Sequence, residues 1–295
     1  SHVCGICGIA PFEVNRTVDS SILRRMTDAM THRGPDSSGL HCESGIGLGI
    51  RRLSIIDLQT GDQPIPNEAG DIHLVCNGEI YNYVELRREL QASGHAFRTH
   101  SDAEVILHLY EDYGFEFLKH LRGMFALALW DRRNRSLLLA RDRFGMKPLH
   151  YARGRDAFYF GSEQKSILLT NAIERQLDLQ SMQSVFEFGF VTGQRTLCSG
   201  IFRLPPGHYL LYRQGTVAIR EYWDVRFPQR QEIQSVPVDE LADALSEKLD
   251  ESVRLHLRSD VSVGAWLSGG LDSSGVTGLM SRYVDHPLQT FSIAF

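Results

Sequence analysis

The chain has 295 residues, of which 42% are hydrophobic and 23% charged, and its formal net charge is −5. This composition excludes a disordered chain, a collagen-like repeat and a simple coiled coil, and the length favours two domains. The negative net charge argues against nucleic acid or an anionic membrane surface as a partner. We expect no membrane span and no signal segment, and the odd count of five cysteines favours the reducing cytoplasm over a disulfide framework.

The first two hundred residues predict many antiparallel strands with a few helices, which is an α+β domain. Apolar runs bounded by turn residues predict strands at 47–56, 72–76, 124–130, 137–139, 158–160, 209–212 and 216–219. The Asn77-Gly78 pair is typical of a tight turn and should end the second strand. Helical spacing predicts helices at 84–92 and 104–113. Two charged segments, 32–36 and 140–145, are typical of loops with solvated charges.

A polar segment without periodicity predicts a linker at 224–236, between domains at 4–223 and 237–295. After it come a helix that opens near Ser235 and Pro237, an apolar run at 261–267, a helix at 275–283 and a buried strand at 288–295. This order of elements is typical of the start of a parallel α/β sheet. Because two strands are too few for an open sheet, we expect the second domain to be incomplete.

The segment between that apolar run and the following helix suits a phosphate or pyrophosphate. It reads Ser268-Gly269-Gly270-Leu271-Asp272-Ser273-Ser274. Its glycines allow backbone N–H groups to converge, the helix N-terminus adds its positive end, and the hydroxyls add donors. The pattern is not that of a Walker loop. The alternative is a glycine turn whose Asp and Ser only cap the helix.

The Cys4-x-x-Cys7 spacing near the start allows three interpretations. A redox pair would need a preceding strand, for which there are no residues. A zinc site would need a second ligand pair, although histidines could contribute, and the sequence assigns no metal ligands. Alternatively, a cysteine that becomes the N-terminal residue would have its own α-amine beside the thiol, and the amine could accept the thiol proton.

Other polar groups lie on predicted strands and helix starts. Arg51 and Arg52 are adjacent in a strand, so one of them must face away from solvent or towards a cleft, where a guanidinium suits a carboxylate. The alternative is charge on an edge strand. Asn77-Gly78-Glu79 is typical of a turn, and Asp102 after Ser101 is typical of a helix N-cap.

Nine short segments, spread over nearly the whole chain, stand in the same order as the motifs of one known family. They are CGICG (4–8), HRGPD (32–36), RLSIID (52–57), NGEIYN (77–82), SDAEVI (101–106), ARDRFGMKPL (140–149), LPPG (204–207), SGGLDSS (268–274) and TFSIAF (290–295). Together they resemble the glutamine-hydrolysing asparagine synthetases of bacterial type. CGIxG alone also resembles other N-terminal-nucleophile amidotransferases, and SGGxDS alone resembles GMP, NAD and argininosuccinate synthetases. The conjunction of the two is far more specific.

The resemblance implies a four-layer αββα N-terminal-nucleophile hydrolase domain, followed by a truncated α/β domain of the ATP-pyrophosphatase type. It implies Cys4 as the nucleophile, because Cys4 fits CGIxG and Cys7 does not. Attack on the glutamine amide would give a thioester and ammonia, with the oxyanion held by the Asn77 side chain and the Gly78 N–H. The implied glutamine-binding residues are Arg52, Leu53, Ser54, Ile55, Ile56, Asn77, Gly78, Glu79 and Asp102.

In this scheme Arg52 clamps the glutamine α-carboxylate, and Glu79 and Asp102 receive its α-ammonium. The ammonia would amidate aspartate that has been adenylated with ATP, with Mg²⁺ neutralising phosphate charge. The products would be asparagine, AMP and diphosphate. The implied ATP-binding residues are Leu267, Ser268, Gly269, Gly270, Leu271, Asp272, Ser273, Ser274 and Ile293.

The chain departs from the family pattern at both ends. Ser1-His2-Val3 precede Cys4, although the family needs cysteine first, and we interpret Ser-His as a tag remnant. The aspartate-binding part of the synthetase domain would lie after Phe295. The alternatives are a related amidotransferase with another carboxylate acceptor, a non-catalytic nucleotide-sensing fragment, and a zinc-binding module. The expected partners are glutamine, ATP and aspartate, or another carboxylate; a homodimer is left open.

Overall fold

The computed structural model describes residues 3–13, 15–232 and 235–294. The chain divides into two compact units, Ser1–Asp224 and Val225–Phe295, and each is described by itself. Among the described residues, no helix combines the length and the apolarity needed to cross a membrane.

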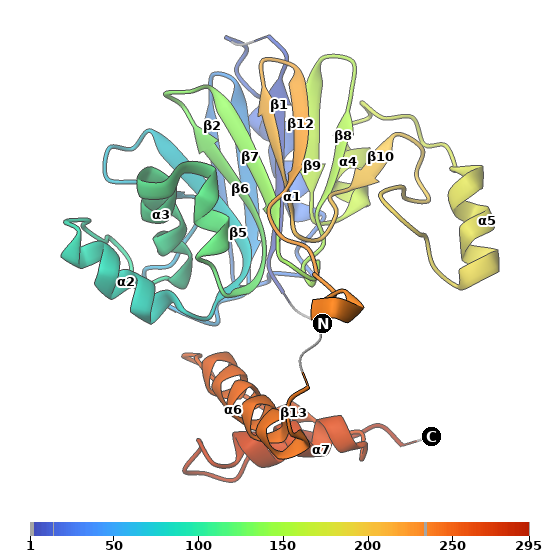
Figure 1. The fold of residues 1–295 in the computed structure, drawn as a ribbon. Helices are drawn as coiled ribbons and strands as arrows, with labels where there is room; N and C mark the ends of the chain where they lie inside the picture. Colours follow the sequence, from blue (N-terminus) through green and yellow to red (C-terminus); the bar gives the residue numbers. More distant parts are fainter. Residues whose placement is uncertain (1–2, 14, 233–234, 295) are drawn as a thin grey trace. The chain divides into compact units, whose positions relative to one another are not determined.

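Unit 1 contains two six-stranded sheets (Figure 1). The first has the order β10-β8-β9-β1-β3-β2 and the second has the order β12-β11-β7-β6-β5-β4, with antiparallel pairing throughout. The strands of the first sheet are β1 (Gly5–Pro11), β2 (Ser37–Glu43), β3 (Ile46–Arg52), β8 (His150–Arg153), β9 (Ala157–Gly161) and β10 (Ile201–Arg203). Those of the second are β4 (Ile65–Pro66), β5 (Ile72–Ile80), β6 (Gly123–Asp131), β7 (Ser136–Arg141), β11 (His208–Arg213) and β12 (Thr216–Glu221).

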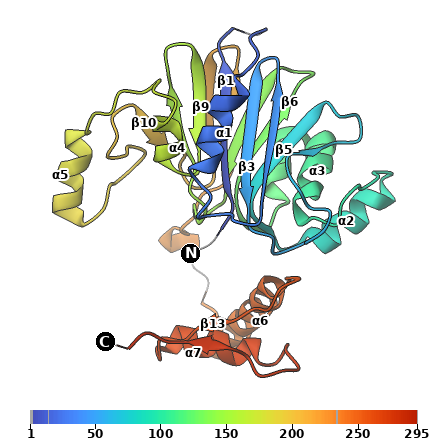
Figure 2. The same ribbon diagram turned by 180° about the vertical axis from the view of Figure 1, so that it is seen from behind.

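Helices cover the outer faces of both sheets. The first sheet is covered by α1 (Ser20–Asp28) and α4 (Gln164–Leu168), as Figure 2 shows for α1. The second is covered by α2 (Tyr83–Ala92) and α3 (Val105–Tyr113), with the short 3₁₀ helices η1 (Asp102–Glu104) and η2 (Gly114–Lys119) at the two ends of α3. Helix α5 (Leu179–Phe188) lies beyond the edge strand β10.

Strand β6 shows how the sequence builds these layers. Side chains alternate across a strand, and in β6 both sets are apolar. Phe125, Leu127 and Leu129 pack with α2 and α3, whereas Ala126, Ala128 and Trp130 pack between the sheets. A third cluster joins the first sheet to α1 and α4. Three cores separate four layers, so the expected αββα architecture is confirmed.

Unit 2 contains η3 (Arg230–Glu232), α6 (Val238–His256), β13 (Ala265–Trp266), α7 (Leu271–Met280) and β14 (Thr290–Phe291). Strands β13 and β14 pair in parallel, which confirms the expected start of an α/β sheet. The core of this unit is small and centres on Val253, Ala265 and Met280. The buried strand expected at 288–295 is wrong, because β14 has two residues and the Phe291 side chain is half exposed.

Two strand predictions in unit 1 are also wrong. The strand expected at 47–56 ends at Arg52, after which the chain leaves the sheet. Strand β5 does not end at a turn at Asn77-Gly78 but stays paired with β6 as far as Ile80. Gly78 has φ +152°, and a Cβ there would lie 2.0 Å from the Met124 carbonyl oxygen. The close approach of the neighbouring strand, not a turn, requires glycine at this position.

Candidate active site

One cavity of unit 1 gathers most of the residues that the resemblance marks for glutamine. It lies where β1 begins, β3 ends and β5 passes η1. From the expected set it is lined by Cys4, Arg52, Leu53, Ile55, Ile56, Asn77, Gly78, Glu79 and Asp102. Ser54 does not line it, and its N–H donates to Asp36 Oδ2 at 2.8 Å. The cavity is also lined by Val3, Gln63, Cys76, Ser101 and Lys147, which are not in the expected glutamine-binding set.

The Cys4 thiol lies against the backbone just beyond β3. Its Sγ accepts the Leu53 N–H at 3.3 Å and lies 3.5 Å from the Leu53 carbonyl oxygen. Arg33 Nε donates to the Cys4 carbonyl at 2.9 Å and so fixes the backbone of the residue. Burial raises the pKa of the thiol, although the Leu53 N–H opposes this effect. The thiol therefore needs a nearby base to become a nucleophile.

Cys7 lies in a different environment. It is fully buried, its Sγ lies 3.3 Å from Thr27 Oγ1, and it packs in the core beneath α1. Burial raises its pKa to about 12, so it is inert. All five cysteines are free, and none of them, within the described residues, belongs to a cluster that could hold a metal. The geometry thus supports neither the redox-pair nor the zinc interpretation.

Arg52 is buried and its guanidinium is oriented by the loop that follows β3. Its Nη2 donates to the carbonyls of Ile56 at 3.0 Å and Asp57 at 2.6 Å. Arg51 points elsewhere, with Nε donating to the Gly34 carbonyl. The expectation that one of the two arginines faces a cleft is confirmed. A guanidinium held in this way has little entropy left to lose when it binds a carboxylate.

Asn77 is the most unusual polar side chain of the cavity. It is fully buried in β5, yet neither Nδ2 nor Oδ1 has a hydrogen-bond partner within the described residues. A buried amide without partners costs stability, so its persistence in a cavity points to a ligand. Its neighbour Gly78 adds backbone to the same wall. Together they form a place where donors can meet a developing negative charge.

Two carboxylates and one ammonium, those of Glu79, Asp102 and Lys147, line the cavity. Burial raises the pKa of Glu79 to about 8, and the Asp102 charge adds to this effect. Burial raises the pKa of Asp102 to about 6, although Oδ2 accepts the Ile80 N–H at 2.7 Å. Burial lowers the pKa of Lys147, although the negative charge of Glu79 opposes this effect. This part of the cavity therefore suits a cationic ligand group.

The helix cap expected at Asp102 is wrong. Ser101 is the cap, because its Oγ accepts the Ala103 N–H at 3.2 Å. This arrangement leaves the Asp102 side chain directed to Ile80 and the cavity.

The predicted phosphate loop has the expected context in unit 2. It runs from β13 into α7, whose first residue is Leu271, so the helix begins earlier than the expected 275. Gly269 has φ +82°, and nothing lies within 4 Å of the position of a Cβ there. The Ser268 and Ser273 hydroxyls lie 3.0 Å apart, and both serines belong to the loop. The glycine conformation and the exposed helix N-terminus leave room for a phosphate.

The family model for the glutamine amidotransferase domain matches residues 3–223. The chain belongs to this family. Residues 244–295 match the model described as asparagine synthase. The two matches together confirm the resemblance to the glutamine-hydrolysing asparagine synthetases.

Individual relatives agree with this family assignment. "Asparagine synthetase [glutamine-hydrolyzing] 1" of Bacillus subtilis is 40% identical over 298 residues, which cover 99% of this chain and 46% of the relative. Synthetase 2 of the same organism is 37% identical over 303 residues, covering 99% and 40% respectively. The chain thus spans about half the length of the curated relatives it matches.

A solved structure supports the fold. The glutamine phosphoribosylpyrophosphate amidotransferase of B. subtilis aligns with a TM-score of 0.54 at 16% identity, covering 98% of this chain and 65% of that chain. At this identity the likeness concerns the fold alone, which agrees with the N-terminal-nucleophile hydrolase fold expected from the sequence.

In this glutamine amidotransferase domain, Lys147 is the charged residue among those that line the cavity outside the expected set. The segment 140–145 is not a simple solvated loop, because Asp142 is buried and accepts the N–H groups of Phe144, Met146 and Lys147. Arg141 is also buried and donates to the Lys147 carbonyl at 2.7 Å. These bonds fold the loop so that Lys147 reaches the cavity. The signal in the sequence was Asp142, because an aspartate in a loop often accepts hydrogen bonds from the backbone N–H groups of the residues that follow it.

Proposed function

We propose that this protein is part of an ATP-dependent, glutamine-hydrolysing asparagine synthetase of the cytoplasm. Unit 1 hydrolyses glutamine to glutamate and ammonia, and the synthetase part uses the ammonia to amidate adenylated aspartate, giving asparagine, AMP and diphosphate. The proposed domains are 4–223 and 237–295, joined by a linker at 224–236. The observation that carries the proposal is a single cavity lined by a thiol, an unpartnered amide, a guanidinium and two carboxylates.

The proposed reaction begins with the Cys4 thiol. When Cys4 is the N-terminal residue, its α-amine accepts the thiol proton, and the sulfur attacks the side-chain amide carbon of glutamine. Asn77 Nδ2 and the Gly78 N–H stabilise the oxyanion. The amine then gives its proton to the departing nitrogen, which leaves as ammonia, and a thioester remains. Water hydrolyses the thioester to glutamate and restores the thiol.

The α-amino acid end of glutamine binds at the opposite wall. Arg52 pairs with the α-carboxylate, because its guanidinium is already oriented by the carbonyls of Ile56 and Asp57. Glu79 and Asp102 receive the α-ammonium, whose charge compensates their burial. Because the site requires both the α-carboxylate and the α-ammonium, it excludes simple amides that lack the amino acid group.

In unit 2 the SGGLDSS loop, with Leu267 directly before it and Ile293 just after β14, is the proposed ATP site. Its glycines and hydroxyls fit the phosphates, as the open space around Gly269 indicates. Mg²⁺ supplies neutralisation of the phosphate charge, and Asp272 is the carboxylate that the loop offers to it.

A diazo-ketone analogue of glutamine tests the proposed nucleophile. We expect it to label Cys4 stoichiometrically in a chain that begins at Cys4, and mass spectrometry of peptides identifies the site. Cys4→Ser should remove the label, and Cys42→Ser, which changes a cysteine outside the cavity, should keep it. Labelling spread over several cysteines, or no labelling, contradicts the proposal.

A second experiment tests the acceptor. Glutamine-dependent AMP formation by the full-length protein should be fastest with aspartate. If another carboxylic acid is the best substrate, the alternative amidotransferase is the correct function.

Glutamine binding is expected to release protons near neutral pH. In the free protein the raised pKa values of Glu79, about 8, and Asp102, about 6, leave part of the pair protonated. An incoming ammonium favours the ionised carboxylates, so on the order of one proton leaves per glutamine between pH 6 and 8. Calorimetry in buffers of different ionisation enthalpy measures this number. Glu79→Gln should reduce it, and identical heats in all buffers would contradict the assignment.

The same pKa values give a sign for stability. Both carboxylates bind protons more tightly when folded than when unfolded. The free protein therefore loses stability as pH rises from the ordinary carboxyl pKa values of 3.8 and 4.5 to the raised pKa values of about 6 for Asp102 and about 8 for Glu79. Glutamine should offset part of this loss, because its ammonium compensates the buried charges.

A further inference from the structure

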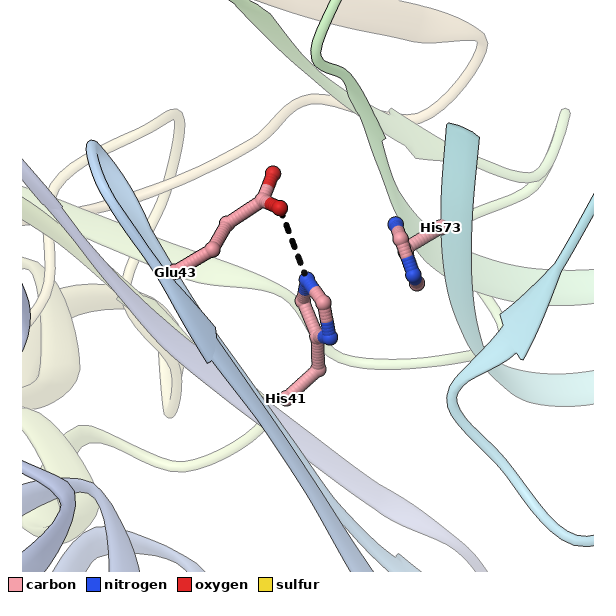
Figure 3. A group of neighbouring side chains, drawn as sticks. All are labelled: His41, Glu43 and His73. Atoms are coloured by element: carbon pink, nitrogen blue, oxygen red, sulfur yellow. Dashed lines mark ion pairs between the residues drawn. The ribbon is translucent and has the colours of Figure 1, made fainter. Parts of the chain in front are cut away.

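A second polar cluster lies away from the cavity, between the two sheets of unit 1. Figure 3 shows its members, His41 and Glu43 from β2 and His73 from β5. Strand β2 is an edge of the first sheet, and β5 lies next to the edge strand β4 of the second. The cluster thus brings together side chains from the same border of two separate sheets.

The cluster brings three possible ligand atoms close together. Each residue offers one atom, and these atoms all lie within 4.8 Å of one another. His41 Nε2 lies 3.6 Å from Glu43 Oε2, and the two imidazole rings stack with centroids 3.7 Å apart. His41 Nε2 and His73 Nδ1 are both buried without a hydrogen-bond partner among the described residues. Two buried ring nitrogens without partners need an explanation.

We propose that His41, Glu43 and His73 bind a divalent transition-metal ion of the zinc type, which links the borders of the two sheets. Two imidazoles and a carboxylate form a donor set that zinc accepts, and a fourth position stays open for water. Two ligands at about 2.1 Å from a tetrahedral metal lie about 3.4 Å apart, close to the separation between His41 Nε2 and Glu43 Oε2. The stacked rings converge on the ion by turning about Cβ–Cγ, a torsion with a broad minimum.

The surroundings of Glu43 both support and oppose the ion. Trp130 Nε1 donates to Glu43 Oε1, which orients the carboxylate as outer partners of metal ligands do. Arg132 Nη1 lies 3.4 Å from Glu43 Oε2, the oxygen that faces His41, and Nη2 donates to the Gly70 carbonyl at 2.9 Å. Arg132 is half exposed, so it competes with the ion and can withdraw to solvent. Replacing it should strengthen metal binding.

The other histidine cluster of unit 1 is less suited to a metal. There, His95 Nε2 is bonded to Asp112 at 2.9 Å and His108 Nδ1 to Glu111 at 3.1 Å. Each imidazole already has a carboxylate partner, so these residues form an ion-pair network. In that network His108 Nε2 is the one buried ring nitrogen without a hydrogen-bond partner among the described residues, whereas the cluster of His41, Glu43 and His73 has two.

Titration of the full chain with Zn²⁺ and with Co²⁺ tests the site. We expect one tight equivalent, and its affinity should fall at least about 100-fold in His41→Ala and in His73→Ala. The exposed His286→Ala removes an imidazole from unit 2 and should change nothing, whereas Arg132→Gln should bind more tightly. The bound Co²⁺ should show no thiolate charge-transfer absorption, which separates this site from the cysteines.

Thermal unfolding with and without chelator shows whether each variant folds, and Zn²⁺ should raise the Tm of the unaltered chain but not of folded His73→Ala. His73→Gln provides a second variant of similar size if the alanine variant does not fold. Unchanged Zn²⁺ affinity in the folded His73 variant, thiolate absorption in the Co²⁺ form, or weaker binding in Arg132→Gln would each overturn the proposal. Labelling of Cys4 by the glutamine analogue should not respond to any of these variants, so this test is independent of the proposed function.

Discussion

A chain that begins at Cys4 is expected to hydrolyse glutamine about 100- to 10,000-fold faster than the same chain with Ser1-His2-Val3 retained. In the longer chain the nitrogen of Cys4 is an amide, which cannot accept a proton. Burial also raises the pKa of the Cys4 thiol, so little thiolate forms unaided. Removing three residues supplies an α-amine with an ordinary pKa of about 7.7–8.0, beside the sulfur.

The measurement is ammonia release from glutamine, compared between the two chains at the same concentration. Acetylating the amine of the shorter chain should return the rate to that of the longer one, since acetylation removes the base but keeps the thiol. Cys4→Ser in the shorter chain should lower the rate as strongly. Equal rates in the long and short chains would contradict a role for the α-amine and leave Cys4 without its base.

The layered fold of unit 1 could be predicted because its signals are local. The apolar run at 124–130 and the turn after it predicted the hairpin of β6 and β7, and both strands form as expected. Helix α2 follows its helical spacing and is confirmed at Tyr83–Ala92. In these segments periodicity and turn chemistry agree with the tertiary structure.

Predictions based on single residues were wrong where tertiary contacts decide. Asn77-Gly78 looks like a turn from sequence, but pairing with β6 keeps both residues in a strand and makes them part of the cavity wall. Asp102 looks like a cap, but the hydroxyl of Ser101 takes that place and frees the carboxylate. Both errors lie at the candidate site, where tertiary contacts override the local preference of the sequence.

The cavity could be anticipated only through the resemblance. Cys4, Arg52, Asn77 and Asp102 are far apart in sequence, and neither periodicity nor spacing relates them. Lys147 was missed because its segment is charged and resembles an exposed loop. Its burial depends on Arg141 and Asp142, whose hydrogen bonds to the same loop become visible only in three dimensions.

Asn77→Ala is expected to lower kcat for glutamine hydrolysis about 100- to 1,000-fold while leaving the KM for glutamine nearly unchanged. The amide would act on the oxyanion, a charge that exists only after the sulfur has attacked. In the proposed site, ground-state binding would instead depend on Arg52, Glu79 and Asp102, which this change leaves in place.

The same variant should destabilise the free protein by no more than the free energy cost of the small cavity that the shorter side chain leaves. The amide of Asn77 is fully buried and has no partner within the described residues, so its removal also removes a desolvation cost of about 1–3 kcal/mol. Asn77→Leu, which refills the volume without a donor, should therefore raise Tm and remain inactive. A structural role predicts the opposite pattern, with Tm falling together with activity in both variants. Measuring Tm and kcat on the same preparations separates the two, and an active Asn77→Leu would exclude Asn77 as an oxyanion donor.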